Sequence, residues 1–166
     1  MRIGVVSDTH LSPRADRLPQ ALVDGLQGVE LILHAGDWTS PHIADLLGEI
    51  APVDGVAGNN DGSDIIARFR MKKLLTLGSH LVGIVHGHIG SRSTLDNAIE
   101  AFRGDGPDVI IFGHSHIPYI GKHQGALLFN PGSPTDKRFQ PKYSYGILEL
   151  GQGEAKATHY YYEAKQ

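Results

Sequence analysis

Residues 2–10, Arg-Ile-Gly-Val-Val-Ser-Asp-Thr-His, combine an apolar run typical of a buried strand with two residues that can bind a metal, Asp8 and His10. Further along the chain, apolar runs end in the same way, at Asp37, Asn59, His86 and His114. In an open, mostly parallel α/β sheet, the carboxyl ends of the strands line one edge, so polar loops there converge on one crevice. The recurrence therefore predicts a metal site at that edge, and with it a metal-dependent enzyme.

The first part of the chain alternates strand and helix patterns. Strands are predicted at residues 2–7, 30–34 and 53–57, and helices at 19–26 and 41–49. This order is typical of parallel strands joined by helices. Ser40 followed by Pro41 indicates a helix start with serine as the N-cap, so Asp37 falls in the loop just before a helix.

The rest of the chain is richer in strands. After Gly62 the pattern predicts a hairpin of strands 70–77 and 80–85, then helix 93–102 and a buried strand at 108–112. Four further strands are predicted at 119–120, 126–129, 143–150 and 155–162. We therefore expect an α/β fold in which two mixed β-sheets pack as a sandwich flanked by helices. Because no linker or repeat interrupts the chain, we expect one domain over residues 1–166.

The composition excludes several classes of protein. With 166 residues, 40% of them hydrophobic, the chain is long enough for one domain with a sizeable core. A formal net charge of −3 shows no basic excess, so dedicated nucleic-acid binding is not expected. The absence of cysteine excludes disulfides and thiolate metal sites. Since no apolar run suits a secretory signal or a membrane helix, we expect a soluble cytoplasmic protein that does not act at a membrane.

The candidate metal ligands are mixed in type, and they are Asp8, His10, Asp37, Asn59, His86, His114 and His116. Each motif alone is ordinary turn chemistry, but two His-x-His pairs after apolar strands are hard to explain as core histidines. The set is too large for one tetrahedral zinc ion, which implies two divalent metal ions. Carboxylate, amide and imidazole ligands without sulfur suit Mn²⁺, Fe or Zn²⁺. One of the two aspartates should bridge the ions.

A site with two metal ions favours phosphoester hydrolysis. Ions roughly 3.5–4 Å apart can bind a phosphoryl oxygen, acidify a shared water and neutralise the charge of an in-line displacement. The chain has neither the Gly-rich phosphate loop of nucleotide-triphosphate motors nor a Gly-x-Ser-x-Gly nucleophile elbow.

The ordered motifs resemble those of the calcineurin-like metallophosphoesterase superfamily, and they are Asp8-Thr9-His10, Gly36-Asp37, Gly58-Asn59-Asn60-Asp61, His86-Gly87-His88 and Gly113-His114-Ser115-His116. The small size and Asn130-Pro131-Gly132-Ser133 are similar to its compact bacterial and archaeal phosphodiesterases, relatives of the retromer subunit of eukaryotes. The resemblance covers nearly the whole chain and implies the same two-sheet fold.

This resemblance also implies a role for each candidate ligand. Asp8, His10 and His116 would bind one metal ion. Asn59, His86 and His114 would bind the other, with Asp37 bridging the two. A hydroxide between the ions would attack the phosphorus of a small phosphodiester substrate. Manganese is the metal most often implied, with iron, zinc, nickel and magnesium as alternatives.

One position departs from the family pattern. Many members carry a histidine, proposed to protonate the leaving group or bind phosphate, where this chain has Asn60. An amide cannot supply a proton at neutral pH, so we predict modest turnover and a preference for good leaving groups unless His88 or water substitutes. Asn60 and His88 are therefore the candidate catalytic residues. Asp61 is expected to end the turn or to cap the segment after it.

Several alternatives stay open from the sequence. They are a non-catalytic metal-binding scaffold on the same fold, a nuclease, a phosphomonoesterase, and hydrolysis of an amide or thioester. The complete ligand set favours chemistry over a scaffold. Trp38 either lines a substrate pocket or packs against the helix after it. Arg14 and Arg92 follow site motifs and either steer phosphate or are solvated loop residues. An exposed sheet edge among the C-terminal strands leaves a homodimer open.

Overall fold

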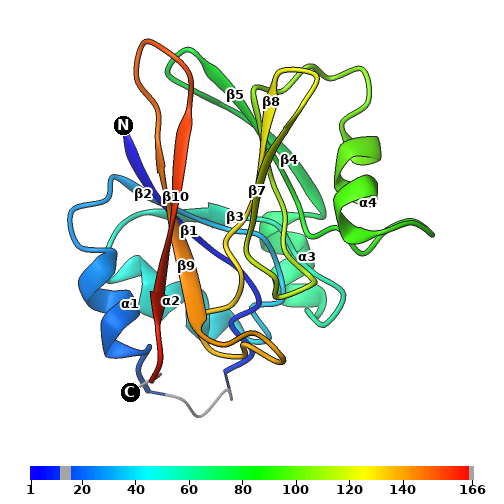
Figure 1. The fold of residues 1–166 in the computed structure, drawn as a ribbon. Helices are drawn as coiled ribbons and strands as arrows, with labels where there is room; N and C mark the ends of the chain where they lie inside the picture. Colours follow the sequence, from blue (N-terminus) through cyan, green and yellow to red (C-terminus); the bar gives the residue numbers. More distant parts are fainter. Residues whose placement is uncertain (12–15, 165–166) are drawn as a thin grey trace.

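A computed structural model describes residues 1–11 and 16–164 and contains two five-stranded sheets that face each other (Figure 1). Arg14 lies outside the described residues. Each sheet contains three strands paired in parallel and two further strands that are added through antiparallel pairing. The predicted α/β sandwich of two mixed sheets is therefore confirmed.

The first sheet has the strand order β10-β9-β1-β2-β3. Its strands are β1 (Arg2–Val6), β2 (Leu31–His34), β3 (Val53–Gly55), β9 (Tyr143–Glu149) and β10 (Lys156–Tyr162). The second sheet has the order β4-β5-β6-β8-β7. Its strands are β4 (Lys72–Leu77), β5 (His80–Val85), β6 (Val109–Ile111), β7 (Tyr119–His123) and β8 (Ala126–Asn130). The parallel strands are β1, β2 and β3 in the first sheet, and β5, β6 and β8 in the second.

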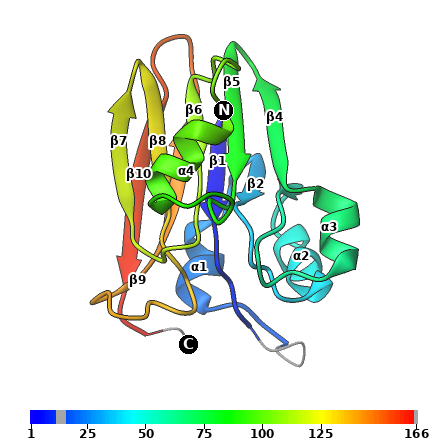
Figure 2. The same cartoon turned by 90° about the vertical axis from the view of Figure 1, so that its right-hand side faces the viewer.

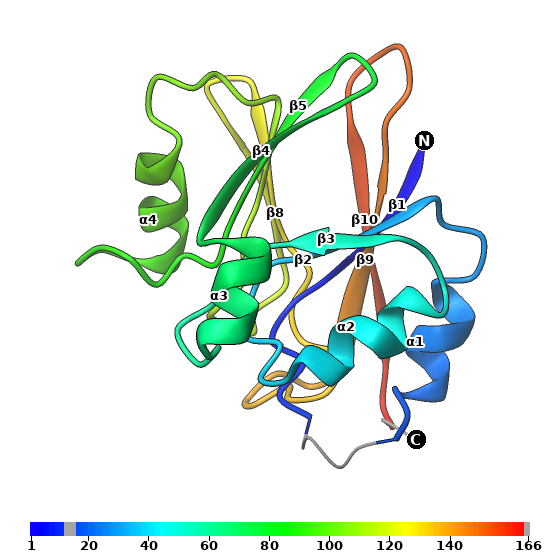
Figure 3. The ribbon, with the colours of Figure 1, turned by 180° about the vertical axis from the view of Figure 1, so that it is seen from behind.

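The helices cover the outer faces of the sandwich. They are α1 (Gln20–Gly25), α2 (Pro41–Gly48), α3 (Ser63–Phe69) and α4 (Thr94–Ala101). Helices α1 and α2 pack on the first sheet, and α4 packs on the second (Figures 2 and 3). The predicted N-cap of α2 is confirmed, because the Ser40 side chain accepts a hydrogen bond from the His42 amide at 3.2 Å.

The core between the sheets follows from the two-residue period of β1. Ile3 and Val5 face the second sheet and join a fully apolar cluster with Ile84, Ile111 and Phe129. Val6, on the opposite face of β1, instead packs with the residues of α1 and α2. Strand β1 is therefore buried on both faces, and the polar residues after its end are held on a rigid support.

Helix α3 is absent from the sequence prediction, which places a turn at residues 58–62 and assigns no element between Gly62 and the strand at 70–77. The pattern that marks it is short: Asp64 lies in the first turn, and Ile65 and Phe69, one turn apart, are buried. The strand begins at Lys72 because Arg70, with a left-handed φ of 72°, ends the helix. Other predicted elements are present with boundaries that shift by a few residues.

Strand β10 lies at the edge of the first sheet, as expected for the C-terminal strands. Among residues 1–11 and 16–164, no helix is long and apolar enough to cross a membrane. A homodimer, a cytoplasmic location and a single domain over the whole chain stay predictions.

Candidate metal centre

The sandwich brings all the predicted ligands to one edge. They lie on the loops that leave the carboxyl ends of β1, β2, β3, β5 and β6. The first sheet supplies Asp8, His10, Asp37 and Asn59, and the second supplies the two His-x-His motifs. The predicted convergence of strand ends therefore occurs across two sheets.

Asp8, His10 and His116 form one group whose ligand atoms lie within 4.8 Å of one another. The Oδ1 atom of Asp8 is 3.7 Å from Nε2 of His10 and 3.5 Å from Nε2 of His116. None of these three buried atoms has a hydrogen-bond partner among the described residues. Buried polar atoms are normally paired, so three unpaired ligand atoms facing one point fit a bound cation.

Asp8, Asp37 and His86 form a second group that shares Asp8 with the first. Nε2 of His86 lies 3.3 Å from Oδ2 of Asp37 and 3.6 Å from Oδ1 of Asp8. Nδ1 of His114 lies 3.3 Å from the same His86 nitrogen and 3.2 Å from Oδ1 of Asn59. The four residues Asn59, His86, His114 and Asp37 therefore present a mixed oxygen and nitrogen set suited to a second divalent ion.

The two carboxylates lie between the groups. Oδ2 of Asp37 is 3.6 Å from Nε2 of His10, in the first group, as well as close to His86 in the second. Asp8 is held from its other side, because Oδ2 accepts hydrogen bonds from the Ser7 hydroxyl at 2.7 Å and from the His114 amide at 3.0 Å. Oδ1 of Asp8 is left to face the imidazoles.

The electrostatics favour charged carboxylates. Burial opposes the charge of Asp8, but His10, His86 and His116 outweigh it and lower the pKa of Asp8 below its ordinary value. Burial likewise opposes the charge of Asp37, but His86 and the hydrogen bonds from Asn60 together outweigh it and hold the pKa of this carboxyl well below its ordinary value. In return, the Asp8 carboxylate raises the pKa of His10. The site is thus built to hold negative oxygen atoms beside cationic partners.

Four of the candidate ligands adopt a left-handed backbone that residues other than glycine rarely adopt. The φ angles are 58° at Asp8, 59° at Asp37, 70° at His114 and 63° at His116. Such conformations cost on the order of 1–3 kcal/mol each and persist only where neighbouring structure enforces them. Four of them in one cluster indicate that the ligand positions, not local stability, determine the shape of these loops.

Asp61 enforces the loop that carries Asp37. Its carboxylate accepts hydrogen bonds from the amides of Asp37, Thr39 and Gly58, each at 2.8 Å. Asn60 binds the other side of Asp37, donating from its backbone N to Oδ1 and from Nδ2 to Oδ2, both at 2.9 Å. The expected turn-ending role of Asp61 is thus part of a larger one, since its carboxylate links the loops after β2 and β3.

His34 joins two ligand loops from beneath. Its Nδ1 accepts a hydrogen bond from the Gly36 amide at 3.0 Å, so the ring proton sits on Nε2, which donates to the Thr9 hydroxyl at 2.9 Å. The ring stacks on Trp38, which in turn stacks on Phe69 of α3. Trp38 is fully buried, so of the two alternatives, packing is confirmed and a pocket lining is not.

His88 lies beside the second ligand group. Its ring centroid is 5.4 Å from that of His86 and 6.2 Å from that of His114. Its buried Nδ1 has no hydrogen-bond partner within the part of the chain that the structure describes. Burial, with His86 and His114 nearby, lowers the pKa of His88. The residue therefore sits where a substrate group could meet it without being a ligand of either group.

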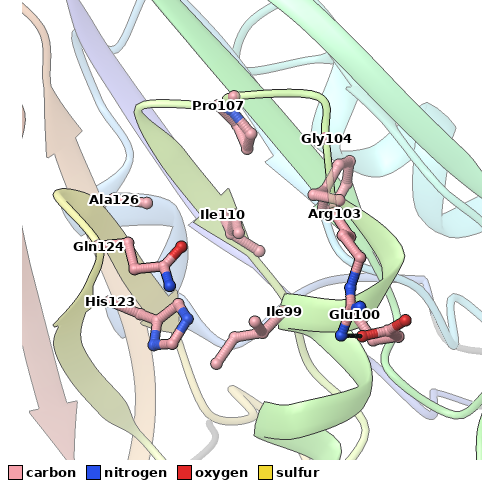
Figure 4. Close-up of a pocket in the computed structure, with 11 residues that line it drawn as sticks. Ile99, Glu100, Arg103, Gly104, Pro107, Ile110, His123, Gln124 and Ala126 are labelled. Atoms are coloured by element: carbon pink, nitrogen blue, oxygen red, sulfur yellow. Dashed lines mark ion pairs between the residues drawn. The ribbon is translucent and has the colours of Figure 1, made fainter.

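A cavity of about 570 Å³ lies away from this chemistry, between α4 and the β7–β8 hairpin (Figure 4). Ile99 of α4 and Arg103, just after the helix, face His123 and Gln124 across it, and Arg103 pairs with Glu100 at 2.7 Å. Its lining, taken over the described residues, includes no candidate ligand. Its size alone does not make it a functional site, and the ligand cluster is the stronger candidate.

Comparison with known proteins gives the family. A family model described as the calcineurin-like phosphoesterase superfamily domain matches residues 1–153. The chain belongs to this superfamily. A probable metallophosphoesterase of Methanothermobacter thermautotrophicus is 44% identical over 138 residues, which are 83% of this chain and 80% of that relative. The family predicted from the ordered motifs is confirmed.

Two solved structures have the same fold as this chain. An archaeal phosphodiesterase is 25% identical and superposes with a TM-score of 0.73, over 96% of this chain and 100% of that one. Vps29 of Entamoeba histolytica, solved with Zn²⁺, is 23% identical with a TM-score of 0.74, over 97% and 99% of the two chains. The likeness to Vps29 shows the fold alone.

We predict that His34 makes stability pH-dependent in metal-free protein. Burial lowers the pKa of His34 from 6.5 to about 3. Below pH 6.5 the unfolded chain takes up a proton that the native ring refuses, so the free energy of unfolding falls by up to about 1.4 kcal/mol per pH unit until pH approaches 3. Denaturant unfolding with chelator at about pH 7, 6 and 5 measures this slope.

The exchange His34→Gln should remove this pH dependence of the free energy of unfolding. The exchange His123→Gln, at an exposed position of β7, should leave it unchanged. Parallel pH slopes for the wild type and the His34→Gln protein would mean that His34 does not contribute.

Proposed function

We propose that this protein is a phosphodiesterase that works with two divalent metal ions. The proposal rests above all on the two ligand groups that share Asp8, in which Oδ1 of Asp8 and Nε2 of His10 and His116 are buried without partners among the described residues. Membership of a metallophosphoesterase superfamily supports phosphorus chemistry, and the likeness to an archaeal phosphodiesterase supports a diester substrate.

The candidate ligands fall into two sets, one for each ion. Asp8, His10 and His116 would hold one ion, and Asn59, His86 and His114 the other, with Asp37 between them. Two divalent cations, when bound, supply the positive charge that a phosphoryl group needs and lower the pKa of water. Mn²⁺ is the metal we favour, and Fe, Zn²⁺, Ni²⁺ and Mg²⁺ are the alternatives for the same oxygen and nitrogen ligands.

The loops around the ligands fix where they point. Nδ1 of His86 lies 2.8 Å from the Ala35 carbonyl, which directs Nε2 of that ring toward the carboxylates. Nδ1 of His116 likewise bonds to the Asp136 carbonyl, so its Nε2 faces Asp8. Such partners of the second ring nitrogen set the tautomer and orientation of metal-binding histidines.

Asn60 donates hydrogen bonds to the Asp37 carboxylate from both its backbone and its side-chain nitrogen. We assign it the role of positioning this carboxylate, because an amide does not donate a proton to a leaving group at neutral pH. His88 is the remaining candidate for contact with the leaving group, given its place beside His86 and His114. A phosphodiester with a good leaving group is therefore the substrate that this site would cleave fastest.

We further propose that the protein is cytoplasmic and that its substrate is a small phosphodiester. A non-catalytic scaffold is the rival function, and the complete ligand set argues against it.

The first experiment is hydrolysis of bis(p-nitrophenyl) phosphate and of p-nitrophenyl phosphate by chelator-stripped protein, before and after addition of Mn²⁺. Diester cleavage that appears with Mn²⁺ and exceeds monoester cleavage is expected. Metal binding without either activity would support the scaffold.

The exchange Asp37→Ala should reduce the occupancy of both ions, because the carboxylate lies within 3.6 Å of His10 in one group and 3.3 Å of His86 in the other. Metal content after dialysis, measured by elemental analysis, should fall from two ions per chain toward none. Asp105→Ala, which removes an equal charge at an exposed ion pair with Lys72, is the control. Loss of one ion alone would mean that Asp37 is not the bridge.

The exchange Asn60→His should raise the rate on alkyl esters relative to aryl esters, since a histidine here can protonate a poor leaving group. We expect the alkyl-to-aryl ratio of kcat to rise on the order of 10²-fold, the usual effect of a positioned acid. An unchanged ratio in a variant that still binds both ions would show that leaving-group protonation does not limit the reaction.

A further inference from the structure

A basic pair that the ligand set does not use lies beside the metal centre. Lys137 and Arg138 belong to the loop between β8 and β9, and with His10 they line a cavity of about 410 Å³. Thr135, Asp136 and Tyr143 complete its wall. Since His10 is a candidate ligand of the first group, the cavity adjoins the place where a bound phosphoryl group would lie.

The loop that carries the pair is tied to the centre by hydrogen bonds. The Ser133 hydroxyl donates to the Asp8 carbonyl at 2.8 Å and accepts from the Asp136 amide at 2.9 Å. The Asp136 carbonyl bonds to Nδ1 of His116. Lys137 and Arg138 directly follow this segment, whose backbone is bonded to the candidate ligands Asp8 and His116. The two basic residues are therefore kept beside the site.

The two cations are only weakly engaged by the protein. Nζ of Lys137 donates to the Pro141 carbonyl at 3.4 Å and lies 5.2 Å from the centre of the Tyr143 ring. Nε of Arg138 lies 3.9 Å from Oδ2 of Asp136, a long and half-exposed ion pair. The lining has two basic side chains and one carboxylate, so a net positive charge faces the cavity. Exposed pairs at such distances contribute little and are easily exchanged for a better anion.

This local charge contrasts with the whole chain, whose formal net charge is −3. Two divalent ions beside the Asp8 and Asp37 carboxylates leave a charge of about +2, which balances a phosphodiester and an attacking hydroxide together. Additional cations at the edge of the centre are therefore not needed by the reacting phosphate. Arginine binds phosphate oxygens through a fork of donors, and lysine adds a compact charge beside it.

We propose that Lys137 and Arg138 form a subsite for a second phosphate on the substrate. The pair adjoins the first ligand group through His10, whereas His88, the candidate for contact with the leaving group, lies beside the second group, so the second phosphate belongs to the part of the diester that is retained. This rests on the proposed phosphodiesterase function and narrows its substrate class to phosphodiesters that carry a terminal phosphate monoester. The Tyr143 ring lines the same cavity. Substrates without the second phosphate bind to the metal centre alone.

The test compares two aryl diesters with the same leaving group. One is the p-nitrophenyl ester of thymidine 5′-phosphate, and the other is the same ester with an added 3′-phosphate. With Mn²⁺, the wild type should cleave the phosphorylated ester with a kcat/KM roughly 10-fold or more higher, as expected for charge-assisted hydrogen bonds. The preference should shrink as the salt concentration rises from about 20 to about 500 mM, because salt screens the added charge.

The double variant Lys137→Gln/Arg138→Gln should bring the ratio of the two kcat/KM values close to one. The control Arg103→Gln/Lys122→Gln removes the same number of charges from the end of α4 and from β7, away from the candidate ligands, and should keep the ratio of the wild type. A wild-type ratio near one, or a ratio that the first variant leaves unchanged, would overturn the proposal.

A binding measurement separates this subsite from the proposed activity. Calorimetry with Mn²⁺-loaded protein compares thymidine 3′,5′-bisphosphate with thymidine 5′-phosphate. If neither ester is hydrolysed, the proposed function fails, yet tighter binding of the bisphosphate that is lost in the first double variant would still support the subsite. Equal binding of the two nucleotides would overturn the subsite, whether or not the esters are cleaved.

Discussion

The carboxylate of Asp8 is the constraint on which the rest of the structure depends. Its Oδ2 is bonded by the Ser7 hydroxyl of the first sheet and by the His114 amide of the second, while its Oδ1 faces three imidazoles. A buried carboxylate is costly unless it is paired, and breaking such a network leaves an uncompensated charge. The two sheets are therefore joined through a group that requires positive charge at this one point.

The fold itself brings the ligand loops together at this point. Parallel strands from both sheets end at the same edge, and the buried residues of β1, β6 and β8 keep the strands rigid. The loops then absorb the strain, as the left-handed backbone at Asp8, Asp37 and His116 shows. Asp61 and Asn60 hold Asp37 from two directions, so hydrogen bonds enforce the strained backbone of this residue. Stability in the core and precision in the loops are thus provided by different residues.

The sequence was sufficient for the sandwich and for the ligand candidates because both depend on local patterns. Apolar runs followed by Asp, Asn or His mark the strands and their ends, and these residues do come together. Helix α3 was missed because its apolar positions, such as Ile65 and Phe69, span too short a stretch to show a helical period. The roles of His34 and Lys137 could not be predicted either. They depend on contacts between segments far apart in the chain, such as the bond from His34 to Thr9, which no spacing encodes.

Under the proposed phosphodiesterase function, the hydrogen bonds of Asn60 to Asp37 and the basic pair beside His10 lead to one expectation about catalysis. A site that lacks an acid at the position of Asn60 gains little by acting on the leaving group. It can still raise its rate by using binding energy from a distant part of the substrate to orient the reacting phosphate. A second phosphate held by Lys137 and Arg138 would supply such energy on the side away from the leaving group. Selectivity in this protein would then come from the part of the substrate that is retained, not from the part that departs.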